Sequence, residues 1–227
     1  MNKILITFSF LIMSFLSFSQ EKVEKVKSSA IVYSNWSSTS RKLVVNDGLF
    51  GDSLGERANE VKDKYWSFGL GFRSDFSKHF MWEGGVSFQQ NGEKYNYYGT
   101  DTSYHYRSKY MYISMPIKMY FKYGKSFRAI AGVGVVPQMF VKFKQSLDWT
   151  GPVTNNGNEV VKTTIGYNPF VVSAVFNVGV EMDFSEKITF FLIPEYKVQL
   201  TSSYLRNNSY KHFGRSLGFN VGFAIDI

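Results

Sequence analysis

The last twelve residues alternate between apolar and small or polar side chains without a break, and this pattern limits the possible folds most severely. The apolar positions are Leu217, Phe219, Val221, Phe223, Ile225 and Ile227. A period of two places successive side chains on opposite faces of a β-strand. The pattern therefore predicts a strand with one apolar and one polar face, and its meaning depends on whether other strands share it.

Seven further stretches show similar alternation. They span residues 30–36, 66–73, 80–89, 110–123, 127–144, 170–183 and 189–200. Aromatic residues make up 18% of the chain, and no helical periodicity of useful length accompanies them. These features predict an all-β protein with eight strands.

The expected connections alternate between long and short. The long ones are residues 37–64, 92–107, 147–167 and 201–214, and the short ones are 75–79, 124–126 and 184–187. This is the topology of an outer-membrane barrel, which has tight periplasmic turns and longer external loops. An even number of strands places both termini on the periplasmic side.

The residues on the polar faces indicate which face of the sheet lies inside the barrel. Their charged residues are Arg73, Glu83, Lys118, Lys122, Arg128, Lys142, Glu181, Glu195, Lys197 and Asp226. Most strand glycines lie on the same faces, while Phe, Trp, Met and Leu crowd the opposite ones. The interior of an eight-stranded barrel is just wide enough to be filled by side chains, so aromatic residues from most strands would overfill it. We therefore expect a closed antiparallel transmembrane β-barrel, with charges inside and the apolar face toward lipid.

Two belts of aromatic residues are expected at the two membrane interfaces. The belt near the short turns comprises Phe72, Phe80, Trp82, Phe121, Tyr123, Phe127 and Phe190, and the belt toward the loops comprises Trp66, Phe88, Phe143 and Phe170. Pro116, Pro137 and Pro194 fall within predicted strands, where each removes a backbone donor. Bulges or breaks are expected at these prolines.

The amino terminus has the features of a secretory signal. Lys3 precedes an uncharged stretch from Ile4 to Phe18, and the small residues Ser17 and Ser19 fit cleavage after Ser19. The alternative is an uncleaved N-terminal anchor. The predicted organisation is a signal peptide at 1–19, a periplasmic lead-in at 20–29 and a barrel at 30–227.

The charge distribution and the cysteine content exclude several classes of function. The chain has no cysteine, which excludes a disulfide framework and a lipidated cysteine anchor. Its formal net charge of +8 is dispersed rather than gathered in a basic run. An exported chain without a basic helix is a poor candidate for nucleic-acid binding, so no nucleic-acid partner is expected.

A weak internal repeat is also present. Residues 68–77 resemble residues 176–185, at an offset of 108 positions. Duplication of a half-barrel would produce such a repeat, and so would independent selection of one favourable hairpin.

The chain resembles the small outer-membrane β-barrel proteins of Bacteroidota, often labelled PorT-like. The resemblance rests on the leader ending in Ser17-Phe18-Ser19-Gln20, on the hairpin start Phe68 to Asp75, and on the final strand. Residues 220–227 also resemble the C-terminal signal that barrel-insertion machinery reads, although Ile227 replaces the usual closing aromatic. The resemblance implies an outer-membrane location and, for some members, association with a secretion system.

Residues that could carry chemistry are few. His79, His105 and His212 are never paired at metal spacing, so no metal site, cofactor or catalytic residue is predicted. His212 with Ser216 is the one pair that could suggest a lipid-active enzyme, because some eight-stranded barrels are lipid-modifying hydrolases. The alternative is a solvated loop histidine beside a strand start.

Two other features leave alternatives open. The interior charges fit either a narrow pore or an ion-paired plug, and the narrow lumen favours the plug. Tyr95, Tyr97, Tyr98, Tyr104 and Tyr106, together with Arg107, form either an external binding surface or an extension of the interfacial belt.

The expected function is that of a non-enzymatic outer-membrane barrel with a structural or interaction role, for example as an accessory of a secretion or envelope complex. Its expected partners are outer-membrane lipid, the barrel-insertion machinery during assembly, and secretion or envelope proteins. The alternatives are a lipid-active barrel enzyme, a narrow pore and a soluble β-barrel that binds an apolar ligand.

Overall fold

The computed structural model describes residues 27–45, 60–151, 156–205 and 210–227, and these form ten antiparallel strands. The strands are β1 Ser28–Val45, β2 Glu60–Asp75, β3 Phe80–Tyr98, β4 Ser103–Ser114, β5 Ile117–Gly124, β6 Phe127–Thr150, β7 Gly157–Thr163, β8 Phe170–Asp183, β9 Ile188–Gln199 and β10 Tyr210–Asp226. The predicted signal peptide at 1–19 lies outside the described residues. No helix within the described part has the length and hydropathy of a membrane span.

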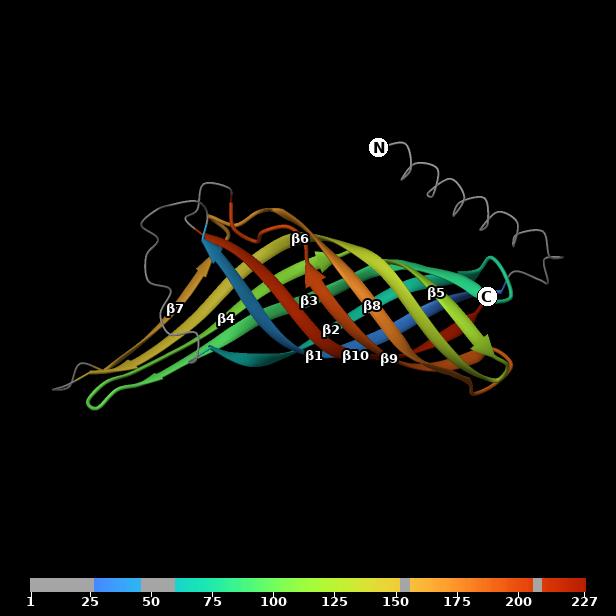
Figure 1. Cartoon of the computed structure of the whole chain (residues 1–227), viewed down its shortest axis with the longest axis horizontal. Coiled ribbons are helices and arrows are strands. Elements are labelled where there is room, and N and C mark those ends of the chain that lie inside the picture. Colours follow the sequence, from blue (N-terminus) through green and yellow to red (C-terminus); the bar gives the residue numbers. More distant parts are fainter. Residues whose placement is uncertain (1–26, 46–59, 152–155, 206–209) are drawn as a thin grey trace, which may run out of the picture.

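The strands close into a ring of eight positions. β4 and β5 share one position between β3 and β6, and the pairing of β2 with β3 completes a ring that runs β1, β2, β3, β4/β5, β6, β8, β9, β10 (Figure 1). β7 pairs only with β6 and lies outside the ring. The predicted closed antiparallel eight-stranded barrel is confirmed.

The three short turns and both described chain ends lie at one end of the barrel. The amide of Ile227 donates to the carbonyl of Ser28, and the amide of Asp226 donates to the carbonyl of Lys187 in the turn before β9. The longer strand extensions reach out at the opposite end, near β4 and β7 in Figure 1. We call the two ends of the barrel the turn end and the loop end.

Several predicted loops are instead strand extensions. β1 continues to Val45 and β2 begins at Glu60, so most of the predicted loop at 37–64 that the structure describes is paired. β3 and β4 pair as far as Tyr98 and Ser103, which leaves only residues 99–102 as the tip of a long hairpin. The predicted loop at 147–167 likewise contains the end of β6 and all of β7. These extensions were not predicted as strands because they are polar and rich in tyrosine, and their pairing does not require an apolar face.

The prolines interrupt pairing, as predicted. Pro116 separates β4 from β5, and its carbonyl accepts from the amide of Gly85 at 3.2 Å. Pro137 lies opposite this break, and its carbonyl accepts from the amide of Met115 at 2.8 Å. The register between β8 and β9 skips two positions beside Pro194 and then resumes unchanged.

The orientation of the two faces is confirmed on every ring strand. Along β10, every even-numbered residue from His212 to Ala224 is buried, while Phe219, Phe223 and Ile225 are 45–48% exposed. The exposed apolar side chains of the ring include Val32, Trp36, Trp66, Phe68, Leu70, Trp82, Val86, Ile113, Ile117, Met119, Phe121, Val133, Val135, Met139, Phe170, Phe176, Val178, Met182, Leu192, Tyr196, Leu217, Phe219, Val221, Phe223 and Ile225. We call this surface the apolar band.

Most predicted belt residues lie on this outer surface. Phe72 contacts Trp82, and Phe190 contacts Phe223, with ring centroids 5.8 and 5.6 Å apart. Phe143 is the exception, because it is 6% exposed and packs against Tyr110 inside the barrel. The register between β4 and β6 skips Val141, and this bulge reverses the faces of the residues that follow. Lys142 consequently lies on the outer face, and its predicted place in the lumen is wrong.

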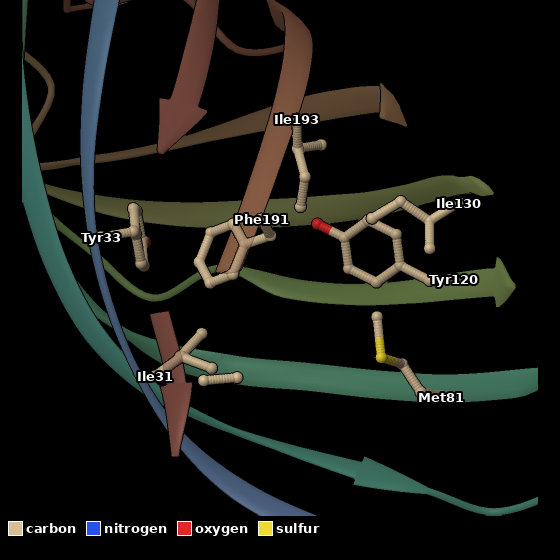
Figure 2. Packing of buried hydrophobic residues seen from close by; sticks show 8 residues of the cluster. Ile31, Tyr33, Met81, Tyr120, Ile130, Phe191 and Ile193 are labelled. Carbon is tan, nitrogen blue, oxygen red and sulfur yellow. The ribbon is translucent and has the colours of Figure 1, made fainter. Parts of the chain in front are cut away.

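The interior also contains an apolar cluster that alternation predicted only in part. It comprises Ile31, Tyr33, Met81, Tyr120, Ile130, Phe191, Ile193 and Ala224, which converge from different strands (Figure 2). Met81, Tyr120 and Ala224 lie on the predicted inner faces, but β9 is apolar on both faces around Phe191, so alternation alone could not assign Phe191 and Ile193 inward. Glycines make room for the rings: a Cβ on Gly132 would lie 2.3 Å from the Tyr120 ring.

Replacing Gly132 with Val should therefore destabilise the barrel by about 1–3 kcal/mol, because it overpacks the interior against Tyr120. Ala131→Val is the matched control, since Ala131 is exposed on the outer face of the same strand. Urea unfolding of both variants in detergent, followed by far-UV circular dichroism, measures the difference. Equal stability of the two variants would contradict the assigned packing.

Candidate functional site

The lumen is crossed by one continuous network of charged and amide side chains. At one end, Arg73 of β2 donates to Glu83 of β3 at 2.7 Å and to Glu181 of β8 at 2.6 Å. All three side chains are at most 5% exposed. Arg73 and Glu181 occupy equivalent positions of the two sequence repeats, 108 residues apart, so the repeats meet through this ion pair.

The same network continues to the remaining strands. Lys118 of β5 lies 3.4 Å from Glu83 and 2.9 Å from Glu195 of β9. The amide of Asn220 on β10 donates to Glu195 at 3.0 Å, and the amide of Asn35 on β1 donates to Asn220 at 2.9 Å. In the other direction, Arg128 of β6 pairs with Glu181 and Asp183. Every position of the ring therefore contributes at least one member, and we call this set the lumen network.

Two further groups fill the lumen toward the loop end. The first is a set of amides in which Gln138 donates to Gln89 and Ser114 and accepts from Ser173, while Lys197 donates to Gln89. The second is an aromatic cluster of Tyr110, Tyr112, Phe143 and Val171, with Phe140, Tyr167 and Tyr204 against it. These layers leave the predicted plug, rather than an open pore, as the arrangement of the described residues.

A small cavity remains at the turn end. Its volume is about 50 Å³, and Arg73, Lys122, Arg128, Asp75 and Glu181 are among its lining residues. Lys122 pairs with Asp75, so even at this mouth the described cations have carboxylate partners.

His212 lies inside the barrel, where it is 2% exposed. Its ring contacts Tyr110 and Tyr204, and its Nε2 lies 3.7 Å from Glu93. Ser216 is four residues farther along the same strand, which separates the two by about 13 Å at a rise of about 3.3 Å per residue. The pair suggested by the sequence is therefore not a catalytic dyad, and the interpretation of His212 as a solvated loop residue is also wrong.

The other two histidines make aromatic contacts at opposite ends of the barrel. His79 stacks on Phe121 and Tyr123 at the turn end. His105 contacts Tyr98 on the hairpin at the loop end. Among the described residues, no three His, Cys, Asp or Glu side chains are grouped so that they could hold a metal ion.

The predicted tyrosines lie on the hairpin of β3 and β4 beyond the apolar band. Tyr95 is opposite Tyr106, and Tyr97 is opposite Tyr104, so these four share one face. The rings of Tyr95 and Tyr106 stack at 5.2 Å, and the hydroxyl of Tyr106 accepts from Arg41 at 2.7 Å. Burial raises the pKa of Tyr106 to about 12, with the nearby Arg41 opposing the shift.

The remaining predicted residue, Arg107, is held by Asp63, which lies within the predicted loop at 37–64. Asp63 accepts from Arg107 at 2.6 Å and pairs with Lys94 at 2.9 Å. Burial of the Asp63 carboxylate favours its neutral form, but hydrogen bonds from Arg107, Lys94 and the backbone outweigh it and lower its pKa. The ion pair with Asp63 therefore anchors the Arg107 side chain at the base of the hairpin.

The chain is similar to known proteins in structure but not in sequence. No family model matches the chain, and no curated protein matches it. The chain is similar to neisserial surface protein A, with a TM-score of 0.44, 11% identity and coverage of 90% of this chain and 100% of that chain. The outer membrane protein OprG of Pseudomonas aeruginosa has a TM-score of 0.44 and 11% identity, with 88% and 96% covered.

The attachment invasion locus protein Ail of Yersinia pestis is also similar, with a TM-score of 0.38, 14% identity and coverage of 88% and 99%. Likenesses at these scores add no argument about function. The functional conclusion therefore rests on the residues of this chain.

Removing Arg73 should destabilise the barrel strongly, because it leaves Glu83 and Glu181 without their closest shared cation. We expect Arg73→Met to cost about 3–5 kcal/mol. Arg215→Met is the matched control, since Arg215 is exposed on the outer face of β10 and makes no ion pair within the described residues. Urea unfolding in detergent measures both, and a loss no larger than that of the control would remove the lumen network as a source of stability.

Proposed function

We propose that this protein is a bacterial outer-membrane β-barrel with a structural or interaction role. The observation that carries the proposal is the apolar band, which has members at every position of the closed ring. Contiguous exposed apolar surface of this extent is costly in water and marks a lipid or protein contact. Because the ring has no open edge, its backbone donors and acceptors are satisfied without water, as hydrocarbon requires.

Membrane orientation follows from the same features. The short turns and both described termini lie at one end, as periplasmic turns do in outer-membrane barrels. The strand extensions at the other end carry Lys62 and Lys94 beyond Trp66, which fits exposure to solvent above the membrane. We therefore include in the proposal periplasmic termini and an external hairpin of β3 and β4.

The alternatives have less support. A soluble barrel that binds an apolar ligand requires an apolar interior to receive it. Here the interior contains the lumen network, and the exterior contains the apolar band. A pore requires a continuous passage, whereas buried ion pairs and amides span the lumen. A lipid-active enzyme has no geometry to support it, because His212 is buried and distant from Ser216. We accordingly propose that the protein has no catalytic activity.

The finer part of the proposal is kinship with the PorT-like proteins and a role beside a secretion or envelope complex. It is supported by the sequence resemblance and by the tyrosine face of the external hairpin, where Tyr97 and Tyr104 are 41% and 38% exposed. Exposed tyrosines on a rigid hairpin offer large contact area at low entropic cost.

Membrane insertion is tested by placing a charge in the apolar band. Leu70 is 65% exposed in the middle of the band on β2, and an outward arginine near the bilayer centre costs about 2–4 kcal/mol. Leu70→Arg should thus lower the yield of folded barrel in phosphatidylcholine vesicles. Val160→Arg, on β7 outside the ring, is the control and should fold normally. If Leu70→Arg folds as well as the control does, the band does not face lipid.

The interaction role is tested by cross-linking and pull-down from detergent-solubilised outer membranes. Replacing Tyr97 and Tyr104 with Ser should reduce specific captured proteins, while Tyr123→Ser, at the turn end, should retain them. A wild-type barrel that is recovered as a monomer without companions counts against the accessory role.

A further inference from the structure

A cationic surface lies on the outer wall of three neighbouring strands, β10, β1 and β2. Ser38 of β1 is opposite Lys64 of β2 on one side and Leu217 of β10 on the other, and Ser40 is opposite Arg215 of β10. Residues opposite one another share a face at about 5 Å, and residues two apart on a strand share it at about 7 Å. Lys42 is the next residue of β1 on that face. We call the group of Ser38, Ser40, Lys42, Lys64 and Arg215 the cationic cradle.

The cradle points away from the lumen. Lys42, Lys64 and Arg215 are exposed, whereas their chain neighbours Asp63 and Ser216 are buried. The two serines between the cations are half-buried and short, so the surface is lower along β1 than along its flanks. The cradle is therefore a shallow site with a hydroxyl floor and cationic sides.

The cations of the cradle have no acidic partner among the described residues. Within these residues, Lys42, Lys64 and Arg215 make no ion pair, and the hydroxyls of Ser38 and Ser40 make no hydrogen bond. The two described carboxylates closest to Lys64 in sequence are engaged elsewhere: Asp63 with Arg107, and Glu60 with Arg41. The lumen cations Arg73, Lys118 and Arg128, in contrast, are each paired with two carboxylates. The outer wall thus concentrates unneutralised positive charge in one place.

The position of the cradle along the barrel axis indicates what kind of ligand it meets. Trp36 and Trp66 are opposite each other, stack at 6.5 Å, and lie immediately below the serines at the loop-end edge of the apolar band. Lys64 Nζ lies 5.3 Å from the centre of the Trp36 ring. Tryptophan marks the depth of lipid headgroups, with the acyl chains beyond it. The site is too shallow to enclose a free anion, but it is continuous with a surface that would hold acyl chains.

We propose that the cationic cradle binds the phosphate of an anionic lipid in the membrane leaflet at the loop end. The guanidinium of Arg215 offers two parallel donors to phosphate oxygens, the two lysines add charge, and the serine hydroxyls donate from below. The acyl chains lie along Leu217, Trp36 and Trp66. This inference rests on the proposed membrane location and adds the headgroup chemistry and the residues that recognise it.

The test uses the full-length chain refolded in phosphatidylcholine vesicles, with and without diphosphoryl lipid A as the probe. Binding is followed by the fluorescence of Trp36 and Trp66 and by the lipid that is retained after detergent extraction. At about a fivefold contribution per surface cation, replacing Lys42, Lys64 and Arg215 together with Gln should weaken binding about 100-fold. Ser38→Val with Ser40→Val keeps all three charges but removes the floor, and it should also weaken binding.

The matched control replaces Lys78, Lys125 and Lys187 with Gln. These exposed lysines lie in the three short turns, so the change in net charge is identical but is placed at the opposite end. The control should bind as the wild type does. An equal loss in both triple variants, or equal wild-type affinity for dephosphorylated lipid A, would overturn the proposal.

Insertion of the wild type into vesicles of phosphatidylcholine alone separates the two proposals. If the chain fails to insert there, the membrane location is wrong. If it inserts but shows no preference for the phosphorylated lipid, only the cradle assignment fails. Circular dichroism of each variant in the same vesicles confirms that a loss of binding is not a loss of fold.

Discussion

The structure depends on the neutralisation of charge inside a closed ring whose outer face is apolar. Because the outer face is apolar on every ring strand, the charged residues must lie inside, where each unpaired charge would be costly. The lumen network meets this requirement by alternating cations and anions, with Asp183, Arg128, Glu181, Arg73 and Glu83 in succession. Since each ring position contributes at least one member, pairing inside the lumen and closure of the ring support one another.

The lumen network also bears on where functional contacts are proposed. Within the described residues, mutually bonded side chains span the interior, and His212 and Ser216 lie about 13 Å apart along one strand. The contacts proposed above are therefore on surfaces outside the lumen: the tyrosine face of the β3–β4 hairpin, and the outer wall. The cationic cradle belongs to that wall and differs from the lumen in having charges of one sign.

Alternation predicted the barrel and the direction of most side chains, and its failures have specific causes. Phe143 was assigned to lipid because nothing in the sequence indicates that the register skips Val141. Phe191 and Ile193 were not predicted inside because β9 is apolar on both faces. The hairpin extensions were read as loops because glycine, tyrosine and charged residues pair there without an apolar face. His212 was placed in a loop for the same reason.

The sequence by itself determined the all-β class, the short turns and the breaks at proline, because these follow from local spacing along one strand. It also determined the outward direction of the apolar residues, because their combined bulk would overfill the narrow lumen. Only the tertiary structure decided which charges meet, as with Arg73 and Glu181, and which residues of three strands share the cradle around Ser38 and Ser40. Those contacts depend on the relative register of strands and on the closure of β2 against β3. A period of two assigns a side chain to a face of the sheet but does not specify which residue lies across from it.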